Sequence, residues 1–145
     1  MSVYSANTYI WEFWNPNLVI DTLKKNARSK MEKACEYLRD EIREDMKSSK
    51  SGRTYYLKFI GKHIAAADGE SPARRYGDLV NAVEYKITEV GDQLIGMIGV
   101  NLDKDEIGYA YFLEMGFRVG GKIYIKPYIR RITFEQSGEI KRMLS

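Results

Sequence analysis

Few residues in this sequence could carry catalytic chemistry. The 145 residues include one cysteine, Cys35, and one histidine, His63. This count excludes an internal disulfide, a multi-cysteine metal site and a His-pair zinc motif, and it weakens any proposal of a Ser-His-Asp or Cys-His pair. Cys35 falls on or beside an apolar helical stripe, and His63 follows Lys62 at the end of an expected strand. We therefore expect an inert, buried thiol, a polar histidine and no enzyme.

Two other patterns resemble binding loops only in part. The acidic segment 102–106 suggests calcium, because an EF-hand loop counted from Asp103 has Gly108 and Glu114 at the required glycine and glutamate positions. Ile107, however, stands where that loop needs an oxygen ligand. The glycine-rich run 116–121 lacks the G-x-G-x-x-G spacing of a phosphate loop, so we expect it to be a turn. The sequence thus predicts neither a metal nor a cofactor.

Composition favours one soluble domain, which we place over residues 1–145. Apolar residues make up 44% and charged residues 30% of the chain, which is ordinary for a globular protein of a length that can bury a real core. No apolar run is long enough to span a membrane, and the N-terminus lacks the basic segment of a secretory signal. The single cysteine suits a reducing compartment.

Charge alternates along the chain around a net value of +3. Residues 21–58 and 118–145 are basic, and residues 59–117 are acidic. Such alternation suits a subunit whose acidic face meets the basic face of a neighbour, because complementary charge sets orientation. A solvated surface without a partner is the alternative.

The elements that would position these residues begin with two distinctive segments. Residues 1–16 form an aromatic N-terminal extension that includes Trp11 and Trp14. It is expected to anchor on the domain's own core, with another subunit as the alternative. From 18 to 47, apolar residues recur every three or four positions and predict one helix. Its length of about 45 Å exceeds a compact domain of this size. The helix must therefore either break near 27–29 or project against a neighbour.

The remaining pattern predicts an α+β fold. It has a long N-terminal helix, a mainly antiparallel sheet of about four strands, a short helix and a C-terminal helix. Alternating, β-branched and aromatic runs predict the strands, and a Gly91-Asp92 turn predicts a hairpin. The strands are expected at 54–60, 83–90, 94–100 and 123–125; an exposed loop at 63–75; a helical turn at 78–82; and helices at 109–115 and from Pro127 to 144.

Three segments carry motifs that occur in the same order in one known family. The first is SGRTYYLKFIGKHIAAADGESPA at 51–73. The second, YGDLVNAV at 76–83, is similar to T-G-x-L-x-x-S-I, with Tyr for Thr and Ala for Ser. The third, YAYFLEMG at 109–116, matches Y-A-x-x-L-E-x-G and is followed by IKPYI at 125–129, where Lys126 replaces the usual Arg of R-P-x-x. Together they resemble the neck or tail-completion proteins of long-tailed bacteriophages.

This resemblance implies a non-enzymatic virion protein of the head–tail junction, made in the host cytoplasm. It would form a homo-oligomeric ring, expected to be hexameric, that completes the tail or joins it to the head around the DNA channel. Its partners would be copies of itself, neighbouring connector and tail proteins, and channel DNA in non-specific contact, with no membrane. The interface residues it suggests are Ala67, Asp68, Gly69, Glu70, Arg74, Arg75, Tyr109, Glu114, Lys126, Arg130 and Arg131.

Several alternatives remain at this point. The chain could be the tail-terminator ring protein of the adjacent layer, which has a similar build. It could instead be a DNA-binding accessory module, and a hydrolase that uses His63 is a remote third. The aromatic residues Tyr109, Tyr111 and Phe112 could face an interface, although a core role is the simpler expectation. The DNA-binding module would use Arg74, Arg75, Lys126, Arg130 and Arg131.

Overall fold

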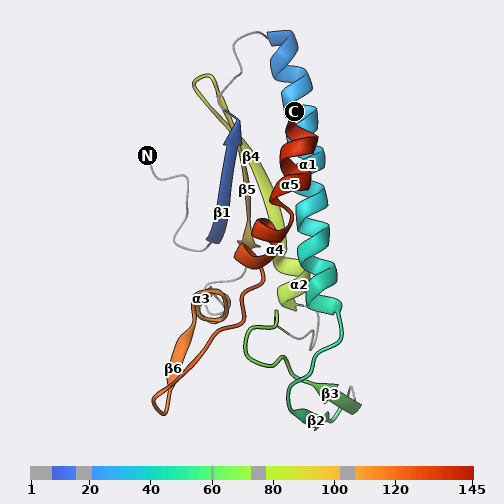
Figure 1. The fold of residues 1–145 in the computed structure, drawn as a ribbon, viewed down its shortest axis with the longest axis vertical. Helices are drawn as coiled ribbons and strands as arrows, with labels where there is room; N and C mark the ends of the chain where they lie inside the picture. Colours follow the sequence, from blue (N-terminus) through green and yellow to red (C-terminus); the bar gives the residue numbers. More distant parts are fainter. Residues whose placement is uncertain (1–7, 16–20, 60, 73–77, 102–106) are drawn as a thin grey trace.

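A single long helix, α1 (Asp21–Lys47), lies beside an antiparallel sheet and forms the main body of the molecule (Figure 1). The computed structural model describes residues 8–15, 21–59, 61–72, 78–101 and 107–145. Within them the fold is α+β, and every strand pairing is antiparallel, as the sequence predicts. No described helix has both the length and the apolar character needed to cross a membrane.

Helix α1 is continuous, so the break expected near residues 27–29 does not occur. The hairpin of β4 (Val83–Val90) and β5 (Gln93–Asn101) runs alongside it. Ion pairs hold α1 to the tip of this hairpin, from Arg28 to Glu89 at 3.2 Å and from Lys24 to Asp92 at 3.9 Å.

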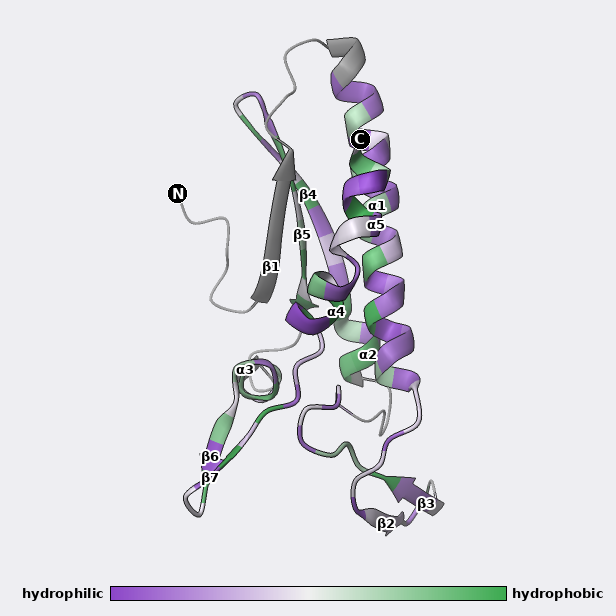
Figure 2. Ribbon diagram, in the orientation of Figure 1, coloured by the Kyte–Doolittle hydropathy of each residue, from purple (hydrophilic) through white to green (hydrophobic). Residues whose placement is uncertain are grey.

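The apolar stripe of α1 faces the sheet and forms the core. Six of its side chains are at most 1% exposed, and they pack with buried residues of β4, β5 and the C-terminal helices. Figure 2 shows hydrophobic residues gathered along the hairpin that faces the helix. Cys35 belongs to this stripe, and burial, reinforced by Glu32 and Glu36, raises its pKa to about 12. The expected inert thiol is therefore a core residue. The six side chains are Met31, Ala34, Cys35, Leu38, Ile42 and Met46.

The aromatic N-terminal segment contributes a strand to this sheet. Strand β1 (Thr8–Asn15) pairs with β5 over its whole length, with Trp11 opposite Ile98, so β5 is the central strand of the order β1-β5-β4. Strand β5 is buried without interruption from Leu94 to Val100. The segment packs on its own domain, as the sequence favours, and it is a strand of the fold over residues 8–15.

Two small hairpins and two short helices lie at the far end of α1 from its N-terminus (Figure 1). The two hairpins extend away from the main sheet, and the four elements together hold most of the sequence motifs. The elements are hairpin β2 (Thr54–Leu57) with β3 (Gly61–Ile64), hairpin β6 (Phe117–Val119) with β7 (Lys122–Tyr124), helix α2 (Asp78–Ala82) and helix α3 (Ile107–Met115).

The hairpins correct two sequence expectations. Residues 61–64 form a strand whose last two residues fall in the loop expected at 63–75, and Phe117–Val119 is a strand within the run expected to be a turn. Gly120 and Gly121 both have positive φ, at +57° and +80°. Two successive residues of this kind make the mirror-image turn that closes a tight hairpin. Gly116, at φ +93°, ends α3 as predicted.

The C-terminal segment forms two helices instead of the single one expected from Pro127. Helix α4 (Arg130–Glu135) and helix α5 (Ser137–Leu144) meet at Gln136, whose side chain accepts a 2.7 Å hydrogen bond from the Tyr37 hydroxyl of α1. Ile140 of α5 is buried against the same helix. The break at Gln136 therefore lets the last helix pack along α1.

We predict that Leu38→Ala lowers the free energy of unfolding by about 2–5 kcal/mol, because it leaves a cavity between α1 and the sheet. Lys33→Ala, on the exposed side of the same helix, should change it by less than about 0.5 kcal/mol. Urea denaturation followed by circular dichroism measures both. Equal losses for the two variants would contradict this packing.

Candidate interaction surface

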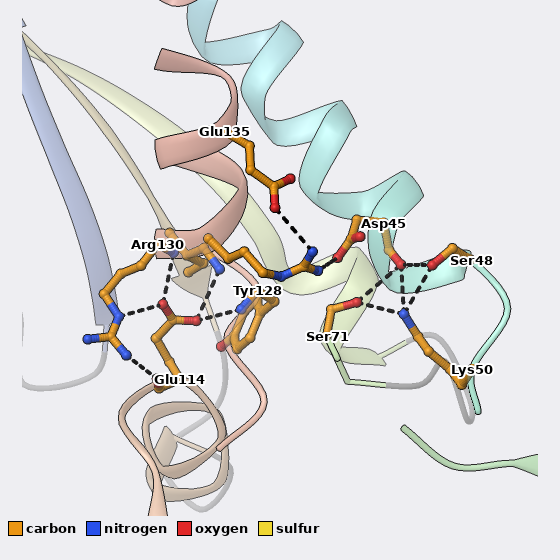
Figure 3. Close-up of polar contacts among 10 residues, drawn as sticks. Asp45, Ser48, Lys50, Ser71, Glu114, Tyr128, Arg130 and Glu135 are labelled. Carbon is orange, nitrogen blue, oxygen red and sulfur yellow. Dashed lines mark hydrogen bonds and ion pairs between the residues drawn. The ribbon is translucent and has the colours of Figure 1, made fainter. Parts of the chain in front are cut away.

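The segments that carry the sequence motifs meet in space beside the end of α3. We call this contact region the joint: it connects Glu114 to residues 128–130 and Lys126 to Ala66. The carboxylate of Glu114, at the end of α3, is fully buried and accepts backbone N–H groups of Tyr128, Ile129 and Arg130 at 2.8, 3.0 and 2.8 Å. The Arg130 side chain adds two hydrogen bonds: Nε donates to the Glu114 carboxylate at 3.1 Å, and Nη2 donates to the Glu114 backbone carbonyl at 2.7 Å (Figure 3). Glu114 thus caps α4 and connects two motifs.

The described part of the 63–75 loop is held by the same joint. The Lys126 amine donates to the carbonyl of Ala66 at 2.6 Å, and the N–H of Gly69 donates to the carbonyl of Ile125 at 3.0 Å. Asp68 pairs with Lys122 of β7 at 3.5 Å. These contacts hold Ala66, Asp68 and Gly69 of the loop against the segment that runs from β7 to Lys126.

Glu70 connects this loop to the segment that precedes β2 through hydrogen bonds. Its carboxylate accepts the hydroxyl and N–H of Ser51 at 2.5 and 3.1 Å and the N–H of Ala67 at 2.8 Å. These hydrogen bonds, the one from the Ser51 hydroxyl foremost, lower the pKa of Glu70 from 4.5 to about 2. Glu70 is therefore a structural anion at neutral pH.

A second polar cluster connects the end of α1 to α4. Arg131 contacts Asp45 at 2.5 Å and Glu135 at 3.4 Å (Figure 3). Lys50 donates to the Asp45 carbonyl at 2.8 Å and to the hydroxyl of Ser71, which is fully buried, at 2.6 Å. Burial lowers the pKa of Lys50, with partial compensation from Asp45 and Glu70.

The polar residues expected at an interface are therefore engaged within the chain. Eight of the eleven expected residues take part in the contacts above through a side chain or a backbone N–H group of their own. Arg74 and Arg75 lie outside the described residues, as does most of the acidic loop expected at 101–106. The eight are Ala67, Asp68, Gly69, Glu70, Glu114, Lys126, Arg130 and Arg131.

Tyr109 lies instead on an exposed apolar surface, which the sequence leaves as the alternative to a core role. Its side chain is 60% exposed, and Phe112, on the next turn of α3, is 52% exposed. The core role expected for these aromatic residues is wrong, because α3 buries only its other side, through Ala110, Leu113 and Glu114. We call this exposed set the α3 surface: Tyr109, Tyr111, Phe112, Met115, Val119 and Ile123, each at least 43% exposed.

The α3 surface contains an open apolar hollow of about 490 Å³ between α3 and β6. Phe117 stacks with Tyr124 across the hairpin at 5.6 Å between ring centroids, and Tyr111 meets Phe112 edge-on at 5.9 Å. The sequence holds one signal for it: apart from Glu114, the segment 107–115 has no charged residue on any side of the helix, although a helix at a surface normally has a polar side. The lining residues are Tyr109, Phe112, Leu113, Gly116, Phe117 and Arg118.

Comparison with protein-family models, curated proteins and solved structures found no match for this chain. Among the described residues, no group of three or more histidine, cysteine, aspartate or glutamate side chains is placed to hold a metal ion. His63 lies in β3 opposite Tyr55, where the two rings stack at 6.4 Å.

We predict that Glu114→Ala lowers the free energy of unfolding by about 3–5 kcal/mol, because it leaves buried N–H groups and Arg130 without their acceptor. The control is Glu135→Ala, whose ion pair with Arg131 is half exposed and should contribute less than about 1 kcal/mol. Denaturant titration separates the two. Similar small losses would show that the joint does not depend on the Glu114 carboxylate.

The lowered pKa of Glu70 predicts that the stability of the protein depends on pH in the acid range. Its folded pKa is depressed, so its contribution to stability is complete above the ordinary value of 4.5 and declines as pH falls towards about 2. The stability difference between wild type and Glu70→Gln should therefore be largest near neutral pH and shrink through this window. Urea midpoints measured across the pH range test this, with Glu44→Gln on α1 as the control. A difference that does not vary with pH would refute it.

Proposed function

We propose that this chain is a non-enzymatic subunit of a ring at the head–tail junction of a long-tailed bacteriophage. The ring would complete the tail or join it to the head around the DNA channel. The observation that carries the proposal is the α3 surface, where six apolar side chains stand exposed on one helix and the adjoining hairpin. Soluble monomeric proteins seldom expose large apolar patches, and such patches mark interaction sites.

The position of the α3 surface supports assembly rather than substrate binding. Its hollow is open and almost wholly apolar, and the polar groups of the nearby joint are engaged in internal hydrogen bonds. Arg118, at the edge of the hollow, is exposed. An apolar centre with a charged rim is the ordinary composition of a protein interface.

The way the motifs meet adds a second line of support. Glu114 of the YAYFLEMG segment binds the backbone of the IKPYI segment, and Lys126 and Ile125 of the latter bind the loop of the ADGESPA segment. Residues that build one joint must be retained together for the fold to form. Motifs scattered along the sequence can therefore share a single structural role, consistent with their joint occurrence in neck proteins.

The alternative of a DNA-binding module loses support at three of the five residues first suggested for it. Lys126, Arg130 and Arg131 each contact a carbonyl or carboxylate of the chain itself. Phosphate contacts would have to replace these bonds.

A ring also needs unlike surfaces on one subunit, because each copy must meet a different face of the next. The α3 surface supplies an apolar face. Exposed ion-pairing residues of α1 and the β4–β5 tip, such as Arg28, Glu32 and Glu89, supply a charged one. We expect the two faces to lie in different contacts of the assembly.

The test is the mass of the purified protein in solution. Light scattering over a range of concentrations should show an oligomer, and negative-stain imaging should show rings, alone or with tails of the phage that carries this sequence. Phe112→Ser should lower the mass towards that of a monomer, because it removes an apolar contact at the centre of the α3 surface. Phe134→Ser is the matched control: Phe134 is 80% exposed on α4, outside the α3 surface.

Two results would overturn the proposal. One is a wild-type protein that stays monomeric at every concentration and forms no ring with tails. The other is an oligomer whose mass is the same for wild type and Phe112→Ser, since that assembly would not use the α3 surface.

A further inference from the structure

The hairpin of β2 and β3 is a narrow ribbon that stands away from the main sheet (Figure 1). Its ladder continues at the base, where the N–H of Gly52 donates to the carbonyl of Ala65 and the N–H of Ala65 donates to that of Arg53, both at 2.9 Å. A side chain at Gly52 could not fit, since its Cβ would lie 2.5 Å from the Ala65 oxygen. Backbone hydrogen bonds and close packing at Gly52 and Ala65 therefore fix the ribbon where it joins the rest of the chain.

The ribbon is positively charged. Residues 53–64 contain Arg53, Lys58 and Lys62 and no aspartate or glutamate. All three cations are exposed, and none takes part in an ion pair between described residues. Lys50, just before the ribbon, differs because it is turned inward onto Asp45 and Ser71. Three exposed positive charges on one short hairpin can bind a polyanion.

Flat rings are interleaved with these charges. Tyr56 is 81% and Phe59 88% exposed, and the strand register places Tyr56 directly opposite Lys62. On the other side of the ribbon, the Arg53 guanidinium lies 6.0 Å from the ring centroid of Tyr55, which in turn stacks on His63 with 15° between the ring planes. The ribbon thus offers planar groups on both of its sides, each beside a cation.

We propose that the β2–β3 hairpin is a nucleic-acid contact. Cations along a surface neutralise phosphates, and exposed aromatic rings stack on bases without regard to sequence. A two-stranded ribbon is also narrow enough to enter the major groove of a duplex. The Arg53–Tyr55–His63 column favours nucleic acid over a lipid surface, because stacked planar groups match the faces of bases, whereas peripheral membrane anchors are typically amphipathic helices or acyl chains.

This inference goes beyond the proposed ring. It uses no residue of the α3 surface, and a nucleic-acid contact would serve a monomer as well as an oligomer. Failure of one proposal therefore leaves the other standing.

The experiment is fluorescence anisotropy of a labelled thymidine single strand of about 16 nucleotides, a length that covers a single-strand site, and of a duplex of equal length. The full chain is titrated at about 50 and about 200 mM salt. Three phosphate contacts to a single strand predict affinity that falls about 20-fold between these conditions, and somewhat more for a duplex. Preference for the single strand would assign base stacking, and preference for the duplex would assign groove binding.

The variants separate this ribbon from general positive charge. Lys58→Glu with Lys62→Glu should abolish measurable binding. Lys25→Glu with Lys33→Glu, at exposed positions of α1, makes the same change in net charge and should retain most of it. Tyr56→Ala should weaken single-strand binding at least about fivefold through loss of stacking, with little effect on the salt dependence. Circular dichroism confirms that each variant folds.

Three outcomes would overturn the proposal. They are the absence of binding to either oligonucleotide at the lower salt, an equal loss for the ribbon and α1 charge variants, and binding to vesicles of phosphatidylglycerol and phosphatidylcholine but to neither oligonucleotide. The last would assign the ribbon to a membrane surface.

Discussion

The buried carboxylate of Glu114 is the contact on which the lower half of the molecule depends. A buried charge is costly unless hydrogen bonds replace its hydration, and here three backbone N–H groups and the Arg130 guanidinium do so. Because those N–H groups belong to residues 128–130, the same contact sets where α4 begins. It also returns the chain from the β6–β7 hairpin to the core, where Tyr128 and Ile129 are fully buried.

This joint explains why the motif residues are unsuited to direct contact with partners. Glu70, Lys126 and Arg131 each close one segment onto another, so their polar groups are already satisfied. Binding through them would first have to break internal bonds. The surfaces suited to partners are instead those where binding would bury exposed apolar side chains or neutralise exposed cations. These are the apolar α3 surface and the basic, aromatic β2–β3 ribbon.

The molecule thus divides by physical role. Helix α1 and the β1-β5-β4 sheet share one apolar core and form the rigid body. The two hairpins at its end are short, two-stranded elements, a kind of structure that has little stability by itself. They are held by their bases, at Gly52 and at the Glu114 joint, and their outer faces remain exposed. We expect a partner to stabilise them further when it covers those faces.

The elements with strong local signals could be predicted from the sequence. The apolar spacing of α1, the alternation of β4 and the glycine that ends α3 each specify local structure, and they led to the correct α+β class. The sequence also shows that residues 107–115, apart from Glu114, are uncharged on every side of the helix. It could not show that Phe112 is exposed while Glu114 is buried, or that strand β1 and the ribbon strand at 61–64 form. Those outcomes depend on hydrogen bonds and packing between residues distant in sequence, such as Glu114 with Tyr128 and Trp11 opposite Ile98, and only the folded chain brings such partners together.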